Sequence, residues 1–383
     1  MRFKLTSVVA LILLLAVIML LLLTLKGWLL VPAVAFDDSK SKSPNSSVLA
    51  FANGSAKSVT EQQANEENAS TTGEADIISC GDAKQAPLLH KGALTDEKSA
   101  KKLLAKLSLE SENSQIRLAS LFNQSGDLPK KLETLAGFVR KSQWSKLAFS
   151  RLLVTCGRYE NFEVCDSKAI EQMSEVDSGN GSMWLNLAVL RLKFKDTLGA
   201  IDALELATNS PEFNEYWSES ISLMDNALLA AGLNNPVERT ELTMKLSANG
   251  FYPNTLEVTD FCAQNAGERA DLAVLCLELG KRLYQSTKTT ISRNIGVALQ
   301  QEIYRKLGDA ASAEELEATK TSLNQIFSGK KLNKASELML WDSQLLDFWF
   351  QQVRIFGELK AYSLLVEEAE RLSKDPNYDP CSG

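Results

Sequence analysis

Apolar residues recur at three- and four-residue spacing from about residue 96 to residue 373, with polar turn residues between them. This spacing gathers the apolar side chains on one helix face, so it predicts α-helices, and no segment shows the alternation of a strand. Short loops between such helices favour antiparallel neighbours. Asp96 or Thr95 can cap a first helix that ends at residue 107, and Ser111 or Asn113 a second that ends at residue 122. The later predicted helices cover residues 128–141, 144–156, 164–176, 183–195, 197–208, 213–231, 236–248, 254–265, 268–284, 290–307, 310–327, 336–356 and 359–373.

The predicted helical region, residues 96–383, is longer than a single compact bundle comfortably covers. A stack of antiparallel helix hairpins, in which each hairpin contacts its neighbours, accommodates such a length. We therefore expect an all-α fold built as a helical solenoid.

Residues 5–25 carry no charge and follow Arg2 and Lys4. A helix of this length spans about 31 Å, which matches the hydrocarbon thickness of a bilayer. Basic residues prefer the cytoplasmic side, so the chain beyond Lys26 is expected on the other side, in the periplasm or an equivalent compartment. A cleaved secretory signal is the alternative, because Ala33, Val34 and Ala35 form a small-residue cleavage pattern.

From about residue 36 to residue 95 the sequence is rich in polar residues, and Phe36 and Phe51 are its only aromatics. Such a segment buries too little apolar area to offset its ordering entropy, so it predicts a flexible tether. The expected organisation is a cytoplasmic stub at 1–4, a transmembrane helix at 5–25, a tether at 26–95 and an exported helical domain at 96–383.

The six cysteines all follow the apolar run, and an even count in an oxidising compartment predicts disulfides. Cys156 and Cys165 flank one turn-like segment, and Cys262 and Cys276 flank another. A disulfide in each pair would join two neighbouring helices. Cys80 and Cys381 would then bond each other, or one would be free. Burial as small apolar residues is the alternative for some of the six.

The segment 184–211 carries a specific pattern of large and small residues. Small residues let two helices approach closely, and bulky residues fill the remaining space. This pattern resembles a tetratricopeptide repeat (TPR), a family of helical hairpins that generally recognises proteins and peptides on a concave surface. The matching positions are Trp184, Leu187 and Ala188 in the first helix, Ala200, Leu204 and Ala207 in the second, and Pro211 at its close.

The resemblance covers about 30 residues strongly, and Arg191 replaces the family's usual aromatic. A shift of 34 residues places Ser218 and Asn234 at key positions and breaks the pattern. Tyr304 and Gly308 recover part of it, but Glu317 stands where a bulky apolar residue is expected. We therefore predict a divergent TPR-like solenoid, and no binding residue transfers from the family.

The composition excludes several kinds of chemistry. A formal charge of −7 and a pI near 5.2 argue against a nucleic-acid partner. His90 is the only histidine, which excludes the HExxH zinc motif and multi-histidine metal cages. The phosphate-cradling and nucleophile-elbow glycine motifs are also missing. We expect no cofactor, no metal and no catalytic residue.

The segment 338–356 is the most apolar part of the predicted domain, with Trp341, Phe348 and Trp349 among its aromatics. A helix that is apolar around much of its circumference is expected in the core. The functional alternative is an aromatic groove for a partner helix or an apolar ligand.

These observations favour a non-enzymatic, membrane-anchored interaction module, a scaffold or chaperone-like accessory protein that binds a protein or peptide. Two alternatives stay open. One is a hydrolase that uses a pair of carboxylates on a helical scaffold, and the other is a helical domain that binds an apolar ligand or lipid.

Overall fold

Residues 76–88, 96–123, 127–141, 145–159, 162–248, 255–325 and 329–382 are described by the computed structural model of this chain. They lie within one compact unit. In this part of the chain helices follow one another without a strand, and the only extended pairing is an isolated parallel bridge between Asn180 and Glu212. The predicted all-α fold is therefore confirmed for these residues.

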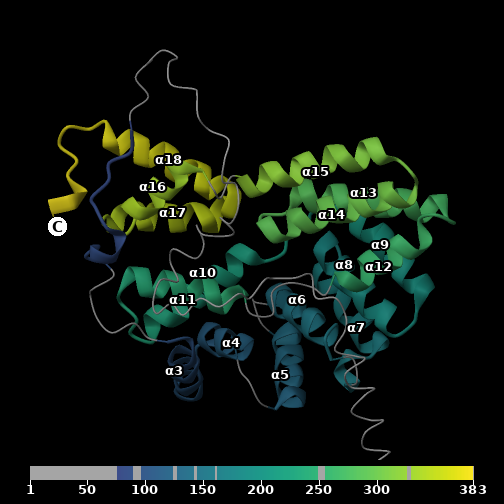
Figure 1. The fold of residues 1–383 in the computed structure, drawn as a ribbon. Coiled ribbons are helices and arrows are strands. Elements are labelled where there is room, and N and C mark those ends of the chain that lie inside the picture. The colour runs from purple at the N-terminus through teal and green to yellow at the C-terminus, as the bar shows by residue number, and fades with distance from the viewer. Residues whose placement is uncertain are drawn as a thin grey trace, which may run out of the picture. The chain divides into compact units, whose positions relative to one another are not determined.

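The helices pack mainly against their neighbours in sequence (Figure 1). The pairs α8–α9 and α13–α14 make the most extensive contacts, and further layers form where α9 meets α13 and α10 meets α17. This arrangement is a helical stack consistent with a repeat solenoid. The α-helices in the described residues are α3 (Glu97–Glu110), α4 (Ser114–Asn123), α5 (Leu128–Lys141), α6 (Ser145–Cys156), α7 (Ser167–Ser174), α8 (Gly181–Lys193), α9 (Thr197–Asn209), α10 (Trp217–Ala230), α11 (Pro236–Ala248), α12 (Leu256–Asn265), α13 (Ala270–Ser286), α14 (Thr290–Lys306), α15 (Ala310–Gln325), α16 (Lys330–Leu338), α17 (Ser343–Phe356) and α18 (Glu358–Ser373).

Side-chain caps fix several helix starts where the sequence predicts them. The Asp96 carboxylate accepts a hydrogen bond from the Ser99 amide at 2.8 Å, and Asp196 caps α9 through the Gly199 amide at 3.0 Å. Such caps satisfy amide groups that the first helical turn leaves without a carbonyl partner. The bounds of α5 and α11 match the predicted ranges.

The single helix predicted over residues 336–356 is wrong. The structure has two helices there, α16 and α17, with a break between Leu338 and Ser343. Asp342 accepts hydrogen bonds from the amides of Gln344 and Leu345 at 2.8 and 3.2 Å, and this cap starts a new helix. The apolar periodicity continues across this break, so the pattern by itself did not indicate the helix cap at Asp342.

The helix predicted over residues 164–176 is shorter than expected. Its first residues belong to a 3-10 turn, η2 (Glu163–Cys165), and α7 is followed directly by a second such turn, η3 (Glu175–Asp177). Cys165 lies at the end of η2 and is bonded to Cys156, so the disulfide holds this segment as a turn beside α6.

Buried apolar side chains form two clusters in the described residues. The first lies among α3 to α9 and α12 to α14, and the second joins α16 to α18 with residues 77–88. Helices α10 and α11 contribute to both, because Leu223 faces the first cluster whereas Trp217 and Ile221 face the second. Asp225 of α10 pairs with Arg239 of α11 at 2.8 Å and lies 3.8 Å from Arg354 of α17, so an ionic network also links these layers.

The predicted tether through residue 95 is wrong for residues 76–88. Ile77, Ala86 and Leu88 are buried in the second cluster, and Cys80 is bonded to Cys381 near the end of the described chain. In Figure 1 this segment runs beside α16 and α18. A few apolar residues and one disulfide order a segment whose average composition is polar, which is why composition alone misplaced the boundary.

The described helices include none that is long and apolar enough to cross a membrane. The transmembrane helix predicted at residues 5–25 lies outside the described residues.

Candidate functional site

The residues that carry the TPR resemblance form the interior of the α8–α9 hairpin. Trp184 is partly buried, and its indole Nε1 donates a hydrogen bond to the Ser178 carbonyl at 2.7 Å. Pro211 is exposed just after α9. These residues pack the hairpin and leave no binding surface of their own. The members with at most 1% of their surface exposed are Leu187, Ala188, Ala200, Leu204 and Ala207.

Polar contacts replace apolar packing where the sequence departs from the TPR pattern. The Arg191 guanidinium donates to the Gly199 carbonyl at 2.6 Å and to Glu171 at 3.0 Å, which ties α8 to α9 and α7. Glu317 accepts a hydrogen bond from the buried Gln301 at 2.6 Å and joins α15 to α14. Arg191 and Glu317 therefore link neighbouring helices through hydrogen bonds, whereas the hydroxyl of Ser218, another irregular position, is buried without a hydrogen-bond partner among the described residues.

The aromatic residues proposed as a groove lie against the second cluster. Trp349 is 5% exposed, and its ring centroid lies 5.7 Å from that of Tyr362 on α18. Trp341 and Phe348 are partly buried against the same cluster. Trp349 is thus a core residue, and the contacts of all three match the core interpretation of this segment.

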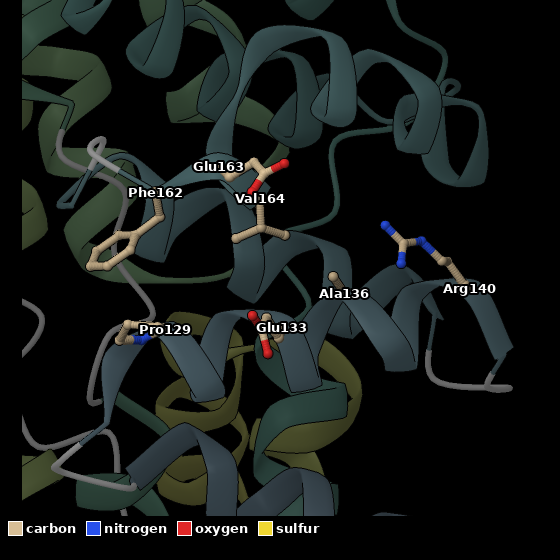
Figure 2. Close-up of a pocket in the computed structure, with 7 residues that line it drawn as sticks. All are labelled: Pro129, Glu133, Ala136, Arg140, Phe162, Glu163 and Val164. Atoms are coloured by element: carbon tan, nitrogen blue, oxygen red, sulfur yellow. The ribbon is translucent and has the colours of Figure 1, made fainter.

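A hollow of about 460 Å³ opens between α5 and the residues around η2 (Figure 2). One wall consists of Pro129, Glu133, Ala136 and Arg140, which follow a single face of α5. The opposite wall is the short segment 162–164. A volume of this size falls within the range of ordinary ligand sites.

The floor of the hollow is apolar and its rim is charged. Phe162 and Val164 are partly buried against the first cluster, whereas Glu133, Arg140 and Glu163 are exposed. In Figure 2 the two glutamates come from opposite walls of the hollow, and the Arg140 side chain lies at one end. An apolar floor with a few converging charged groups is typical of a recognition site.

A disulfide fixes the short wall of the hollow. Cys165 directly follows Val164, and its bond to Cys156 attaches the segment to the end of α6, with a Cα–Cα distance of 5.4 Å. Both cysteines are fully buried. A wall held in this way is ordered before any ligand binds, which lowers the entropic cost of binding.

The two local pairs, Cys156–Cys165 and Cys262–Cys276, are bonded as predicted, and of the two possibilities left open for Cys80 and Cys381 the structure has the bond between them. The Cys262–Cys276 bond staples the α12–α13 hairpin. The first bond instead joins α6 to η2, so it does not staple two α-helices. The structure thus supplies no free thiol for redox or nucleophilic chemistry.

Two carboxyl groups meet elsewhere, at a junction of three loops. Glu215, before α10, accepts hydrogen bonds from the hydroxyls of Ser292 and Thr289. Glu358, at the start of α18, accepts from the amide and hydroxyl of Thr290, each at 3.0 Å. Burial raises the pKa of Glu215 to about 7, and the nearby Glu358 adds to the rise, while the hydroxyl donors lower it. Burial also raises the pKa of Glu358.

The described residues do not form a recognisable catalytic centre. No group of three or more His, Cys, Asp or Glu side chains within them could hold a metal ion. His90 lies outside the described residues. Glycoside hydrolysis by a carboxyl pair needs one acid that burial keeps protonated. Glu133 and Glu163 at the hollow are both exposed. Glu215 and Glu358 have raised pKa values, but they accept hydrogen bonds from residues at the start of α14 and do not line the hollow.

The sequence did not single out the lining of the hollow. Pro129, Glu133, Ala136 and Arg140 recur at helical spacing, which placed them on one face of a predicted helix. Their partner wall comes from a turn some 20 to 30 residues later. The spacing of Cys156 and Cys165 was the one available signal that this turn folds back onto α6.

Comparison with models of known protein families, with curated proteins and with solved structures finds no match to this chain. The fold therefore defines the class of protein, which is an all-α stack of helix hairpins secured by disulfides.

Proposed function

We propose that this chain is a membrane-anchored, TPR-like interaction protein that binds a segment of another protein in the hollow between α5 and η2. Its helical domain acts outside the cytosol, and residues 5–25 form its anchor. The paired cysteines support an oxidising compartment. Recognition occurs without turnover, as in a scaffold or a chaperone-like accessory protein.

The observation that carries this proposal is the hollow itself. It combines an apolar floor, a charged rim and a wall fixed by a disulfide, and it lies on a helical stack of the kind that serves recognition in repeat proteins. A carboxylate-dependent hydrolase receives less support, because the glutamates of the hollow are exposed. The pair with raised pKa values, Glu215 and Glu358, is hydrogen-bonded to the start of α14 and does not line the hollow. A lipid-binding groove receives less support, because Trp349 is in the core.

Site-specific crosslinking in living cells tests the proposal. A photoreactive amino acid replaces Glu133 in the hollow, and in a control chain it replaces Glu314, an exposed residue of α15. We expect a discrete protein adduct at position 133 and none at position 314. The same adducts at both positions, or none at either, would refute binding at this hollow.

Protease added to intact spheroplasts tests the topology separately. We expect the helical domain to be digested in intact spheroplasts, because it lies outside the cytosol. Full protection of the domain until the membrane is lysed would refute the proposed anchor orientation.

A further inference from the structure

The length of the hollow limits what it can hold. Its α5 wall runs from Pro129 to Arg140, and eleven residues of helix span about 16 Å. An extended chain advances about 3.3 Å per residue, so about five residues fill this length. Successive side chains of an extended chain point to opposite sides, so only every second residue faces the hollow. A bound segment therefore presents three side chains.

The chemistry of the hollow changes along that length in a fixed order (Figure 2). Pro129 and Phe162 line the first end, which is apolar. Glu133 and Glu163 lie on opposite walls near the middle, and Arg140 lies at the far end. The complementary order in a ligand is an apolar group, a cation and an anion.

The charges on the rim differ from other exposed charges among the described residues. In the described part of the chain, Glu133, Glu163 and Arg140 take part in no ion pair and in no side-chain hydrogen bond. Other exposed charges do pair, as Lys281 does with Glu278 at 2.6 Å. The two glutamates therefore favour a cation between them, and the guanidinium favours a carboxylate, without first breaking an internal contact.

We propose that the hollow binds an extended polypeptide segment with an apolar residue, a Lys or Arg two positions along, and an Asp or Glu two positions further. This specificity rests on the proposed function of the hollow as a protein-recognition site. The central pair of glutamates contributes most to the specificity among peptides, because an acidic side chain placed there is repelled by two like charges. A peptide with the opposite order, acidic residue first and apolar residue last, can bind in the opposite chain direction and also has its basic residue at the centre.

Two synthetic peptides of equal composition test the pattern. The first is N-acetylated Leu-Ser-Lys-Ser-Asp amide, and the second is N-acetylated Leu-Ser-Asp-Ser-Lys amide, which places the acidic residue centrally in either chain direction. Each carries the same fluorophore, and fluorescence anisotropy measures its binding to the full chain. We expect the second peptide to bind about tenfold more weakly, since two favourable contacts become unfavourable.

A charge-inverted hollow provides the decisive variant. Glu133→Lys, Glu163→Lys and Arg140→Glu in one chain should reverse the preference, so that the second peptide binds more tightly than the first. All three residues are exposed, so the fold should persist, and circular dichroism checks this. The matched control makes the same changes of charge at exposed positions away from the hollow, with Glu314→Lys, Glu315→Lys and Lys374→Glu, and should retain the original preference.

The outcomes separate this inference from the proposed function. Equal binding of the two peptides, or binding of neither, overturns the pattern, even if the crosslink at position 133 still captures a protein. A preference that does not reverse in the charge-inverted chain also overturns it. Loss of the crosslink as well would refute recognition at the hollow altogether.

Discussion

Removing the charge of Glu215 should make the stability of the fold less dependent on pH. This carboxyl group lies at the junction where the loop before α10 meets the start of α14, and its pKa is raised to about 7. The ordinary value is 4.5. The folded chain therefore holds a proton on Glu215 at pH values where the unfolded chain has released it.

The sign and size of the effect follow from linkage between proton binding and folding. The folded state binds more protons than the unfolded state between about pH 4.5 and pH 7. The stabilisation is complete below pH 4.5 and is lost as the pH rises through 7. A shift from 4.5 to about 7 corresponds to about 3 kcal/mol of unfolding free energy, at 1.36 kcal/mol per pKa unit. Glu358 has its pKa raised as well and acts in the same direction.

The variant Glu215→Gln isolates this contribution, because glutamine is neutral throughout the range. Its amide can still accept from one hydroxyl and donate to the other, since Ser292 and Thr289 can each do either. Denaturant unfolding of the full chain, followed by tryptophan fluorescence at pH 5 and pH 8, gives the two free energies. We expect Glu215→Gln to exceed the native chain by about 3 kcal/mol at pH 8 and to differ little from it at pH 5.

A matched control separates this effect from a general change of net charge. Glu205→Gln removes one carboxylate from an exposed position on α9 and should follow the native chain at both pH values. Asp177 also has a pKa raised by burial, but it is present in every variant, so its contribution cancels. If the native chain and Glu215→Gln lose stability in parallel between pH 5 and pH 8, the reasoning about the junction is wrong.

Three further predictions concern the wall of the hollow, the junction and the hairpin core. Replacing both Cys156 and Cys165 with Ala should lower the free energy of unfolding by about 3 kcal/mol and weaken peptide binding. Loss of the α12–α13 disulfide should lower the free energy of unfolding similarly but leave peptide binding unchanged. Denaturant unfolding measures the stability, and fluorescence anisotropy measures the binding. Gly357→Ala should cost at least about 2 kcal/mol in the same unfolding assay, because its φ is 83° and a Cβ would meet the Lys288 carbonyl. Leu204→Ala should cost about 3 kcal/mol by leaving a cavity between α8 and α9, and an unchanged unfolding midpoint would contradict its place in the core.

Local signals in the sequence predicted the helices well where each helix has its own start. Asp96 and Asp196 cap helices at the expected positions. The sequence failed where apolar periodicity ran through a cap, as at Asp342, and where a disulfide held a short segment as a turn, as at Cys165. Periodicity reports which face is buried, but it does not report where the backbone changes direction.

The candidate site was harder to predict than the fold, because its two walls come from different parts of the chain. Glu133 and Arg140 are ordinary surface residues of an amphipathic helix when read alone. They form part of a hollow only because Phe162 and Glu163 lie opposite them, and that juxtaposition depends on tertiary packing. The partly buried pair of Glu215 and Glu358 was missed for the same reason, since 143 positions separate these two glutamates in sequence.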